Sequence, residues 1–271
     1  MHFTFQRPKR FCPNARPQRT IQSRPDPDDL RKRRDTTQRA TLHRVLRTSI
    51  RGRGKGRHRL FSSRHLTGYI DPLKFPEAVI GWDDYRLAPL FQWFRDNPIT
   101  GVVGIIERNP SGNPFIFQGI IRGGELLHVY HKTHLAPEEL SLDSADDELC
   151  IFSQGGINFG LAICADIESE DLFRRYSEAG TQVVLHSSAP GLDGDQTTRN
   201  WQSGYDWWNG ECKAKLGKYA RKHGLTIAAA TQSGRIVDED FPGGGYMFDP
   251  TGAMVSQTED WSEGMLIVSV P

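Results

Sequence analysis

The most constraining feature of this sequence is an apolar, β-forming run that ends on a cysteine and passes directly into a helical pattern. Residues 156–166 read GINFGLAICAD, and in residues 167–176 the apolar spacing changes to that of an amphipathic helix. We therefore predict a buried strand, a turn that carries Cys164, and a helix. A cysteine in such a turn lies near unpaired helix N–H groups, which favour the thiolate. Cys164 is thus a candidate nucleophile.

Taken alone, Cys164 would be interpreted as a small buried side chain, because most cysteines beside Ala and Ile are. A second apolar strand upstream changes this interpretation. Residues 129–135 read VYHKTHL and place Lys132 at the end of that strand. A lysine at a strand end is ordinarily a solvated charge, but a lysine near a thiol lowers the thiol pKa and can bind an oxyanion.

The His-Lys-Thr-His-Leu and Gly-Leu-Ala-Ile-Cys-Ala-Asp segments, in this order, resemble the carbon-nitrogen hydrolase (nitrilase-like) superfamily. The resemblance implies an α/β fold of the α-β-β-α sandwich type and hydrolysis of nitriles, amides or carbamoyl groups by a Glu-Lys-Cys triad. It would make Cys164 the nucleophile and Lys132 the cation that stabilises the oxyanion, assisted by the backbone N–H of Ala165. The 32 positions from Lys132 to Cys164 would suit two neighbouring strands.

The charge of the chain is divided unevenly. Residues 1–60 hold 18 Lys and Arg against 4 Asp, a net charge of +14, whereas the whole chain has a net charge of +1. We expect a basic, Arg/Pro-rich, disordered segment over 1–65 and a truncated hydrolase domain over 66–271. A basic arm can bind nucleic acid, but basic runs without interleaved aromatic residues are more often solvated charge, so no nucleic-acid partner is expected.

The resemblance also implies a residue that this chain lacks. In relatives, the Leu-Thr-Gly-Tyr that begins here at Leu66 follows a strand ending Phe-Pro-Glu, whose glutamate is the general base. The same register gives Phe61, Ser62 and Ser63. The basic segment replaces the N-terminal strands and helix of the fold. A diverged tail is one explanation. We favour an out-of-frame stretch or wrong start, because a packed α/β layer does not lose central strands.

Other glutamates could support the chemistry. Glu77 belongs to a second Phe-Pro-Glu, but this motif follows Leu-Thr-Gly-Tyr and lies in a predicted loop. Glu107 ends a predicted strand and is given a supporting role. Relatives often place a second glutamate in the loop after the lysine, so we assign Glu139 to the catalytic set, with Glu138 as the alternative. A solvated acidic loop is the competing interpretation.

A third strand contributes candidate substrate-binding residues. Residues 181–188 read as a buried parallel strand with a polar end. That end places His186 and Ser187 at the edge of the sheet where active sites gather. With Ala165, they form the predicted substrate-binding set for a small amide or nitrile.

The same pattern reading predicts the remaining elements. A helix is expected over 83–95, a long helix from 197 to 223, and a glycine-bounded hairpin over 246–255. Trp201, Trp207 and Trp208 could line an acyl pocket, although core or dimer packing is the simpler explanation. The list of expected strands is 101–107, 115–121 and 125–131, forming a meander in a shared sheet, then 225–230 and 264–270, the last closing the sheet.

Neither a metal nor a cofactor is expected. His128, His131 and His134 recur every third residue, and side chains three apart on a strand point to opposite faces. The four cysteines have neither zinc-ribbon spacing nor disulfide-scaffold density, which favours a cytoplasmic protein. No run is long and apolar enough to span a membrane. Relatives commonly dimerise, so a homo-oligomer is expected.

These observations predict a hydrolase of non-peptide C–N bonds that works through a cysteine thioester. Because the base glutamate is missing, the polypeptide as written is expected to be inactive or nearly so. Two alternatives from other classes stay open. One is a catalytically inactive binding or regulatory protein with an unreactive Cys164, and the other is a nucleic-acid-binding protein that uses the basic arm.

Overall fold

A computed structural model of the chain describes residues 58–60, 66, 69–192, 198–236, 239–264, 266–268 and 270. The predictions for Phe61, Ser62 and Ser63, and for nearly all of the basic segment, lie outside these residues. The described part contains two main sheets, and the candidate site residues are divided between them.

The first sheet is built around a three-stranded antiparallel meander, as the sequence predicts. The meander pairs β3 with β4 and β4 with β5, and β1 and β2 run parallel to β3 on its other side. Its elements are β1 (His58–Leu60), β2 (Val79–Ile80), α2 (Ala88–Asp96), β3 (Thr100–Glu107), β4 (Phe115–Arg122) and β5 (Glu125–His131).

The second sheet has the order β13-β12-β9-β8-β7-β6, with β7, β8 and β9 parallel and the outer strands antiparallel. Parallel strands buried on both faces need no polar alternation, which fits the continuous burial of β8 and of most of β7. The strands are β6 (Ile151–Gln154), β7 (Ile157–Ile163), β8 (Val183–Ser188), β9 (Thr226–Thr231), β12 (Gly245–Phe248) and β13 (Met254–Gln257); β10 (Ser233–Ile236) and β11 (Glu239–Pro242) form a separate ribbon.

Helices cover the second sheet. The predicted long helix is confirmed as one continuous run, in which α4 (Trp201–Cys212) passes through a π-helical turn into α5 (Lys218–His223) and ends at Gly224 with a φ of 66°. A second helix, α3 (Glu170–Glu178), packs on β7. Glycine at position 160 permits this close approach, because a Cβ there would lie 2.6 Å from the ring of Tyr176.

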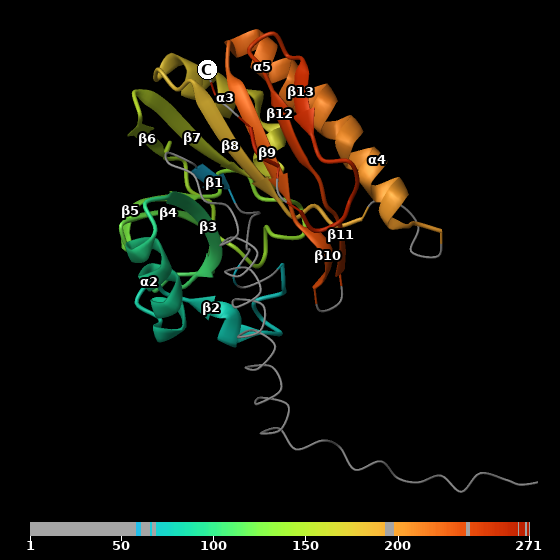
Figure 1. The fold of residues 1–271 in the computed structure, drawn as a ribbon. Coiled ribbons are helices and arrows are strands. Elements are labelled where there is room, and N and C mark those ends of the chain that lie inside the picture. Colours follow the sequence, from blue (N-terminus) through green and yellow to red (C-terminus); the bar gives the residue numbers. More distant parts are fainter. Residues whose placement is uncertain are drawn as a thin grey trace, which may run out of the picture.

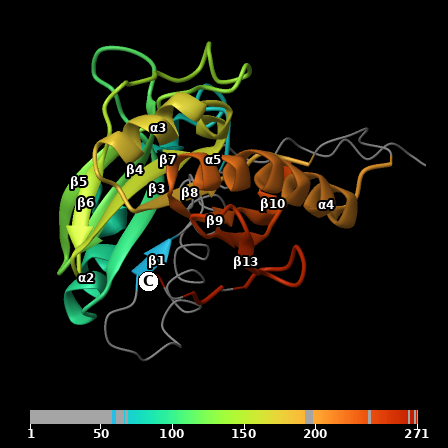
Figure 2. The ribbon, with the colours of Figure 1, turned by 90° about the horizontal axis from the view of Figure 1, so that it is seen from above.

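Three apolar cores bind these layers together. One joins α2 to one face of β3 and β4, and another joins β7, β8 and β9 to α3, α4 and α5. The core between them joins the two sheets directly, through residues such as Val102 and Ile120 on one side and Leu161 and Leu185 on the other. The order is therefore helix, sheet, sheet, helices (Figures 1 and 2).

Two expectations about the sheets are wrong. The 32-residue spacing was expected to join neighbouring strands, but Lys132 and Cys164 follow β5 and β7, which belong to different sheets. The reason is that β3 and β4 are buried on both faces, between α2 and the second sheet. The predicted strand over 264–270 is also absent, since its described residues 264, 266–268 and 270 have no strand pairing.

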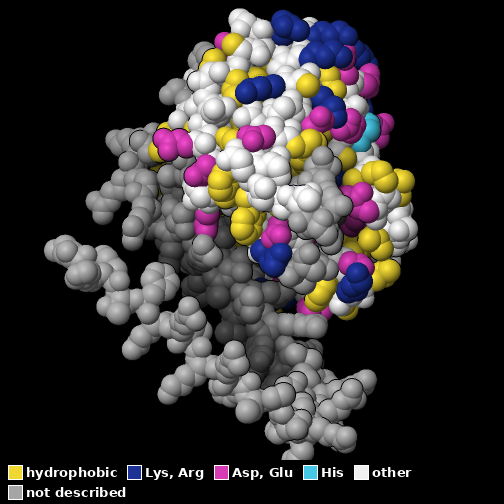
Figure 3. Space-filling view, turned by 90° about the vertical axis from the view of Figure 1, so that its right-hand side faces the viewer, with side chains coloured by type: hydrophobic (Ala, Val, Ile, Leu, Met, Phe, Trp, Pro, Cys, Tyr) yellow, Lys and Arg dark blue, Asp and Glu magenta, His cyan; other side chains and the backbone are white. Residues whose placement is uncertain are grey.

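The surface over the α4–α5 side mixes both signs of charge. Figure 3 shows basic and acidic side chains interspersed on this face, with Lys and Arg gathered towards its top. Several of these charges are paired, as where Lys218 and Lys222 on α5 contact Glu170 on α3. Within the described residues, no helix combines the length and the apolar character that crossing a membrane requires.

Candidate active site

Cys164 lies where β7 ends. It is partly exposed, and its φ of 49° makes it the single non-glycine residue with a positive φ in the described part of the chain. Residues with a side chain avoid this left-handed region, so the backbone at Cys164 is strained. Such strain must be held by surrounding contacts, and it turns the cysteine away from the path of the strand.

The helix after Cys164 differs from the prediction. Cys164 opens a five-residue 3-10 helix (Cys164–Glu168), and α3 begins six residues later, at Glu170. Ser169 caps α3 by accepting a hydrogen bond from the Leu172 N–H, 3.3 Å away. Cys164 therefore lies at the first position of a 3-10 helix and not directly before the α-helix. That helix N–H groups favour its thiolate stays a prediction.

The other described cysteines are in a different environment. Cys150 and Cys212 are buried, and none of the three described cysteines is in a disulfide. Burial raises the pKa of Cys150 to about 12 and raises that of Cys212 further. Buried neutral thiols are poor nucleophiles. Cys164 is therefore the described cysteine best placed to react.

Lys132 follows β5 and is fully buried. Its Nζ lies 2.5 Å from Oε2 of Glu139, which is 2% exposed and also accepts the Ala136 N–H at 2.7 Å. A buried ammonium requires such a partner, because removing an isolated charge from water costs on the order of several kcal/mol. Of the two loop glutamates, Glu139 contacts the lysine, whereas Glu138 is exposed and accepts a hydrogen bond from Tyr69.

The charge of Lys132 acts at the ends of the second sheet's strands. Burial lowers the pKa of His186 to about 4, and the positive charge of Lys132 acts in the same direction. Burial alone would raise the pKa of Asp166, but hydrogen bonds and the Lys132 charge hold it below its usual value. Lys132, on one sheet, is thus electrostatically coupled to residues that flank Cys164 on the other.

His186 and Ser187 are both fully buried on β8. The Nε2 of His186 donates to the Cys164 carbonyl oxygen at 3.1 Å, and its Nδ1 lies 3.3 Å from the Ser188 hydroxyl. With its lowered pKa, His186 is neutral at pH 7 and holds the peptide of Cys164. Ser187 accepts a hydrogen bond from Gln118 on β4, across the two sheets. Their assignment to substrate binding stays a prediction, as does that of the partly exposed Ala165.

Glu107 and the three spaced histidines have separate partners. The imidazole of His131 lies between Glu107 (2.7 Å) and Asp146 (3.1 Å). His128 is exposed, and His134 lies 3.4 Å from Asp166. Among the described residues, no group of three or more His, Cys, Asp or Glu side chains could hold a metal ion. Glu107 thus orients a histidine at the end of β5.

Sequence reasoning missed Asp166, two positions after Cys164. It is completely buried and receives hydrogen bonds from Tyr130, Thr133 and the backbone of His134 and Ile163. Its position beside the nucleophile was part of the motif, but no local pattern indicates which distant groups a buried carboxylate will bind.

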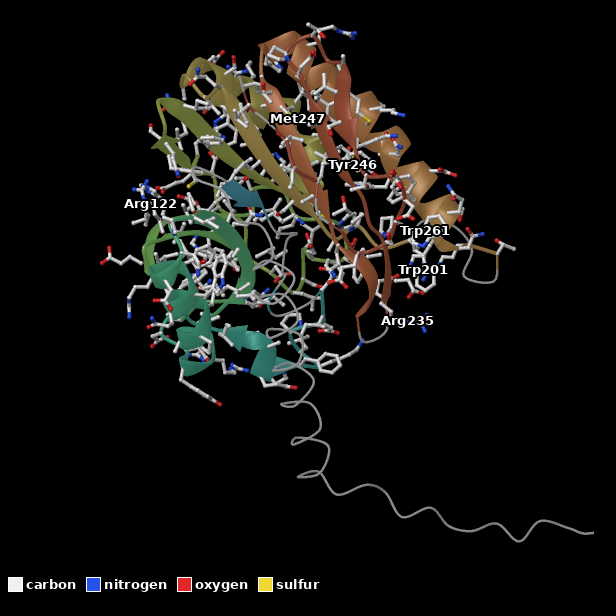
Figure 4. The ribbon with its side chains drawn as sticks, in the orientation of Figure 1. Arg122, Trp201, Arg235, Tyr246, Met247 and Trp261 are labelled. Carbon is white, nitrogen blue, oxygen red and sulfur yellow. The ribbon has the colours of Figure 1, made fainter. Side chains whose placement is uncertain are left out.

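The tryptophans of the long helix lie in different environments. Trp208 is buried in the helix-side core and donates Nε1–H to Thr231 at 2.8 Å. Trp201 begins α4 and is 40% exposed. Figure 4 shows Trp201 and Trp261 on the α4 side of the molecule, on the opposite side from Arg122 at the end of β4. The simpler explanation, packing, therefore accounts for Trp208.

A hollow of about 390 Å³ lies between the edge strands β5 and β6 of the two sheets. It contains none of the candidate catalytic or substrate-binding residues. Its lining residues are Leu126, Leu127, His128, Val129, Glu148, Leu149, Cys150 and Ile151. We therefore do not assign the reaction to this hollow.

The sequence profile of the carbon-nitrogen hydrolase family matches residues 59–271. This chain belongs to the carbon-nitrogen hydrolase family. The resemblance predicted from the lysine and cysteine motifs is confirmed. The family match begins at residue 59, and not at 66 as expected, and it includes most of β1, the short strand that pairs in parallel with β3.

Solved structures share the fold of this chain. A mutant of the Nesterenkonia AN1 amidase from the nitrilase superfamily superposes with a TM-score of 0.69 at 23% identity, over 84% of this carbon-nitrogen hydrolase and 82% of that chain. The glutamine-dependent NAD+ synthetase of Acinetobacter baumannii gives a TM-score of 0.65 at 18% identity, over 84% and 41%. These likenesses confirm the mixed α/β fold.

The curated relative is an (R)-stereoselective amidase from a Pseudomonas species. It is 26% identical over 126 residues, which is 46% of this chain and 46% of the amidase. The chain therefore matches about half the length of this relative.

Proposed function

We propose that this carbon-nitrogen hydrolase attacks a small amide with Cys164 and forms a thioester, using Lys132 to stabilise the oxyanion. The proposal rests on one observation. A strained, partly exposed cysteine lies beside Asp166 and His186, and the charge of Lys132, which is buried against Glu139, acts on the pKa of both. We also infer that the four layers form the α-β-β-α sandwich of the nitrilase type.

In the proposed acylation step, the Cys164 sulfur bonds to the amide carbon and the carbonyl π electrons move to oxygen. The Lys132 ammonium and the Ala165 N–H stabilise this oxyanion. When the oxyanion collapses, the C–N bond breaks and the nitrogen leaves as ammonia or an amine after gaining the thiol proton. The product is a thioester on Cys164. Water must then add to the thioester to release the acid and restore the thiol.

The second half of the reaction is where this chain is expected to be weak. A positioned general base contributes about 10²- to 10⁴-fold per step. The sequence register gives Ser63 where relatives have the base glutamate. Two described carboxylates near the site have other tasks, since Glu139 faces Lys132 and Asp166 accepts four hydrogen bonds. We therefore expect acylation to outpace hydrolysis.

Amides are the favoured substrate class because the similar proteins are amidases. The Pseudomonas relative is an (R)-stereoselective amidase. One mutant of the Nesterenkonia amidase was solved in complex with butyramide. A glutamate-to-glutamine mutant carries adducts of acrylamide and of fluoroacetamide at its active-site cysteine. Small aliphatic amides are thus the first substrates to test, with nitriles and carbamoyl compounds as alternatives.

The test is covalent labelling of the full chain with fluoroacetamide and acrylamide, followed by intact mass measurement and peptide mapping. The expected result is one adduct on Cys164, none on Cys150 or Cys212, and no adduct at this position in Cys164→Ala. Ammonia release from butyramide, measured in parallel, is expected to be slow or absent. Rapid butyramide turnover that needs Cys164 would contradict the expected hydrolytic defect while supporting the amidase assignment.

A catalytically inactive binding protein is the second candidate. The serine in the base position, Ser63, favours it. This alternative predicts that Cys164 reacts no faster than an ordinary exposed thiol, so the same labelling experiment separates the two candidates.

A further inference from the structure

We propose that Asp166 is a positioning residue that fixes Lys132 relative to Cys164 by joining the ends of β5 and β7. This inference rests on the proposed function, because it concerns how the proposed nucleophile and oxyanion-stabilising cation are held together.

One carboxylate oxygen of Asp166 binds the segment that follows Lys132. Its Oδ1 accepts a hydrogen bond from the Thr133 hydroxyl at 2.9 Å and another from the His134 backbone N–H at 2.8 Å. The His134 ring lies 3.4 Å from the same oxygen. The two residues directly after the lysine are therefore fixed by one buried atom.

The other oxygen connects both strands. Asp166 Oδ2 accepts the Tyr130 hydroxyl at 2.7 Å and the Ile163 backbone N–H at 2.7 Å. Tyr130 lies on β5, two positions before Lys132, and Ile163 ends β7, directly before Cys164. The carboxylate thus contacts residues on both sides of the lysine and the residue that precedes the cysteine.

This contact is informative because no sheet hydrogen bond links β5 and β7. The two strands belong to different sheets, and the core between those sheets is largely apolar, with Gln118 on β4 donating to Ser187 on β8. Apolar packing is non-directional and fixes distances less sharply than hydrogen bonds do. Asp166 supplies a directional connection at the place where Lys132 and Cys164 must share a pocket.

The chemistry of this contact requires a carboxylate. All four groups donate, and an ionised carboxylate is a pure acceptor with two oxygens. An asparagine of the same shape would direct an NH₂ group at two of the donors. Asp166→Asn therefore tests the contact with little change in volume. Asp171→Asn is the matched control, because Asp171 is an exposed residue on α3 that pairs with Arg174.

The readout is the rate at which iodoacetamide alkylates Cys164, followed by peptide mapping as a function of pH. In this reaction the thiolate sulfur bonds to carbon, the C–I bond breaks, iodide leaves and the thiol proton passes to buffer. A misplacement of about 1 Å can cost about 100-fold in reactivity, so we expect Asp166→Asn to slow alkylation at neutral pH by roughly tenfold or more. The midpoint of its pH profile should rise, and Asp171→Asn should match the unmodified chain.

A double-mutant comparison tests whether Asp166 acts through Lys132. Lys132→Met with Glu139→Gln removes both charges of the buried pair. In that background, Asp166→Asn should leave the midpoint of the profile unchanged. A further shift of the same size as in the unmodified chain would overturn the positioning role, because the effect would then be independent of the lysine.

The remaining outcomes separate the two proposals. If Cys164 of the unmodified chain titrates like an ordinary thiol, near pH 8.5, the proposed function fails. If Cys164 is activated but Asp166→Asn leaves its profile unchanged, the proposed function stands and the positioning role fails. If Asp166→Asn does not fold, Tyr130→Phe and Thr133→Val each remove one donor. Both should raise the midpoint by smaller steps, and no shift in either would overturn the inference.

Discussion

The lysine region and the cysteine region of the candidate site are built in opposite ways. Lys132 is fully buried and lies 2.5 Å from Glu139, in a hydrogen-bonded loop. Cys164 is partly exposed and held in a backbone conformation that side chains avoid. The difference teaches that an electrostatic group works best when it is excluded from water, whereas a nucleophile must stay accessible.

The two regions also depend on their surroundings in different ways. The charge of Lys132 is tolerated because a carboxylate faces it. The backbone at Cys164 is held by other groups, with His186 donating to its carbonyl and Asp166 accepting the N–H before it. Substitutions should therefore affect the two regions by different mechanisms and in different amounts.

The largest expected effect is the loss of stability when the buried pair of the lysine region is broken. Lys132→Met removes the ammonium that faces the buried Glu139 carboxylate, and breaking a buried pair from one side costs about 3–5 kcal/mol. Lys132→Met with Glu139→Gln should be more stable than the single variant, because no buried charge remains at those two positions. Urea unfolding of the full chain measures both. If the free energy of unfolding of Lys132→Met lay within about 1 kcal/mol of the original protein's, the Lys132–Glu139 pair would contribute no more than a weak surface salt bridge.

A smaller effect on stability tests whether the backbone of the cysteine region is strained. At a φ of 49°, glycine avoids the steric penalty that any Cβ incurs, whereas alanine keeps it. Cys164→Gly is therefore expected to be more stable than Cys164→Ala by about 1 kcal/mol. Thermal unfolding of the two variants, which both lack the thiol, gives this difference directly. Equal stability would mean that the backbone relaxes when the sulfur is removed.

The smallest effect tests whether the lysine side contains a pH-dependent contact. Burial acts to lower the pKa of His131, but its hydrogen bonds with Glu107 and Asp146 raise it above the usual 6.5. A raised folded-state pKa means that stability from this contact is fully present below pH 6.5 and is lost as the pH rises through the folded value.

We expect this contribution to be about 1 kcal/mol or less, because all three side chains are partly exposed. The measurement is the difference in unfolding free energy between the original chain and His131→Gln at several pH values. The difference should shrink from acidic to alkaline conditions. A difference that grows with pH would contradict the assigned sign.

Secondary structure was the part of this fold most open to prediction. The largely apolar run before Cys164 and the run ending at Ser188, apolar with a polar end, were both predicted as buried strands and were found as β7 and β8. The long helix up to Gly224 was found as well. Periodicity reports which face of an element is buried, and this local information is enough to recognise elements of this length.

The arrangement of these elements was not predictable in the same way. Nothing in the pattern of β5 states which strand lies beside it or opposite it, so Lys132 and Cys164 were expected on two neighbouring strands. The choice between Glu138 and Glu139 depends on the path of a loop, and the four donors to Asp166 come from segments about 30 positions apart in sequence. These are long-range contacts, which local sequence does not encode.

The backbone conformation of Cys164 also limits which chemistry this scaffold can evolve. Branching at Cβ makes the left-handed region still less accessible, so threonine is excluded from position 164 on steric grounds. Serine has the same shape as cysteine and faces no added penalty. An oxygen nucleophile could therefore enter this fold only as a primary alcohol, and a secondary alcohol would first require a different turn at the end of β7.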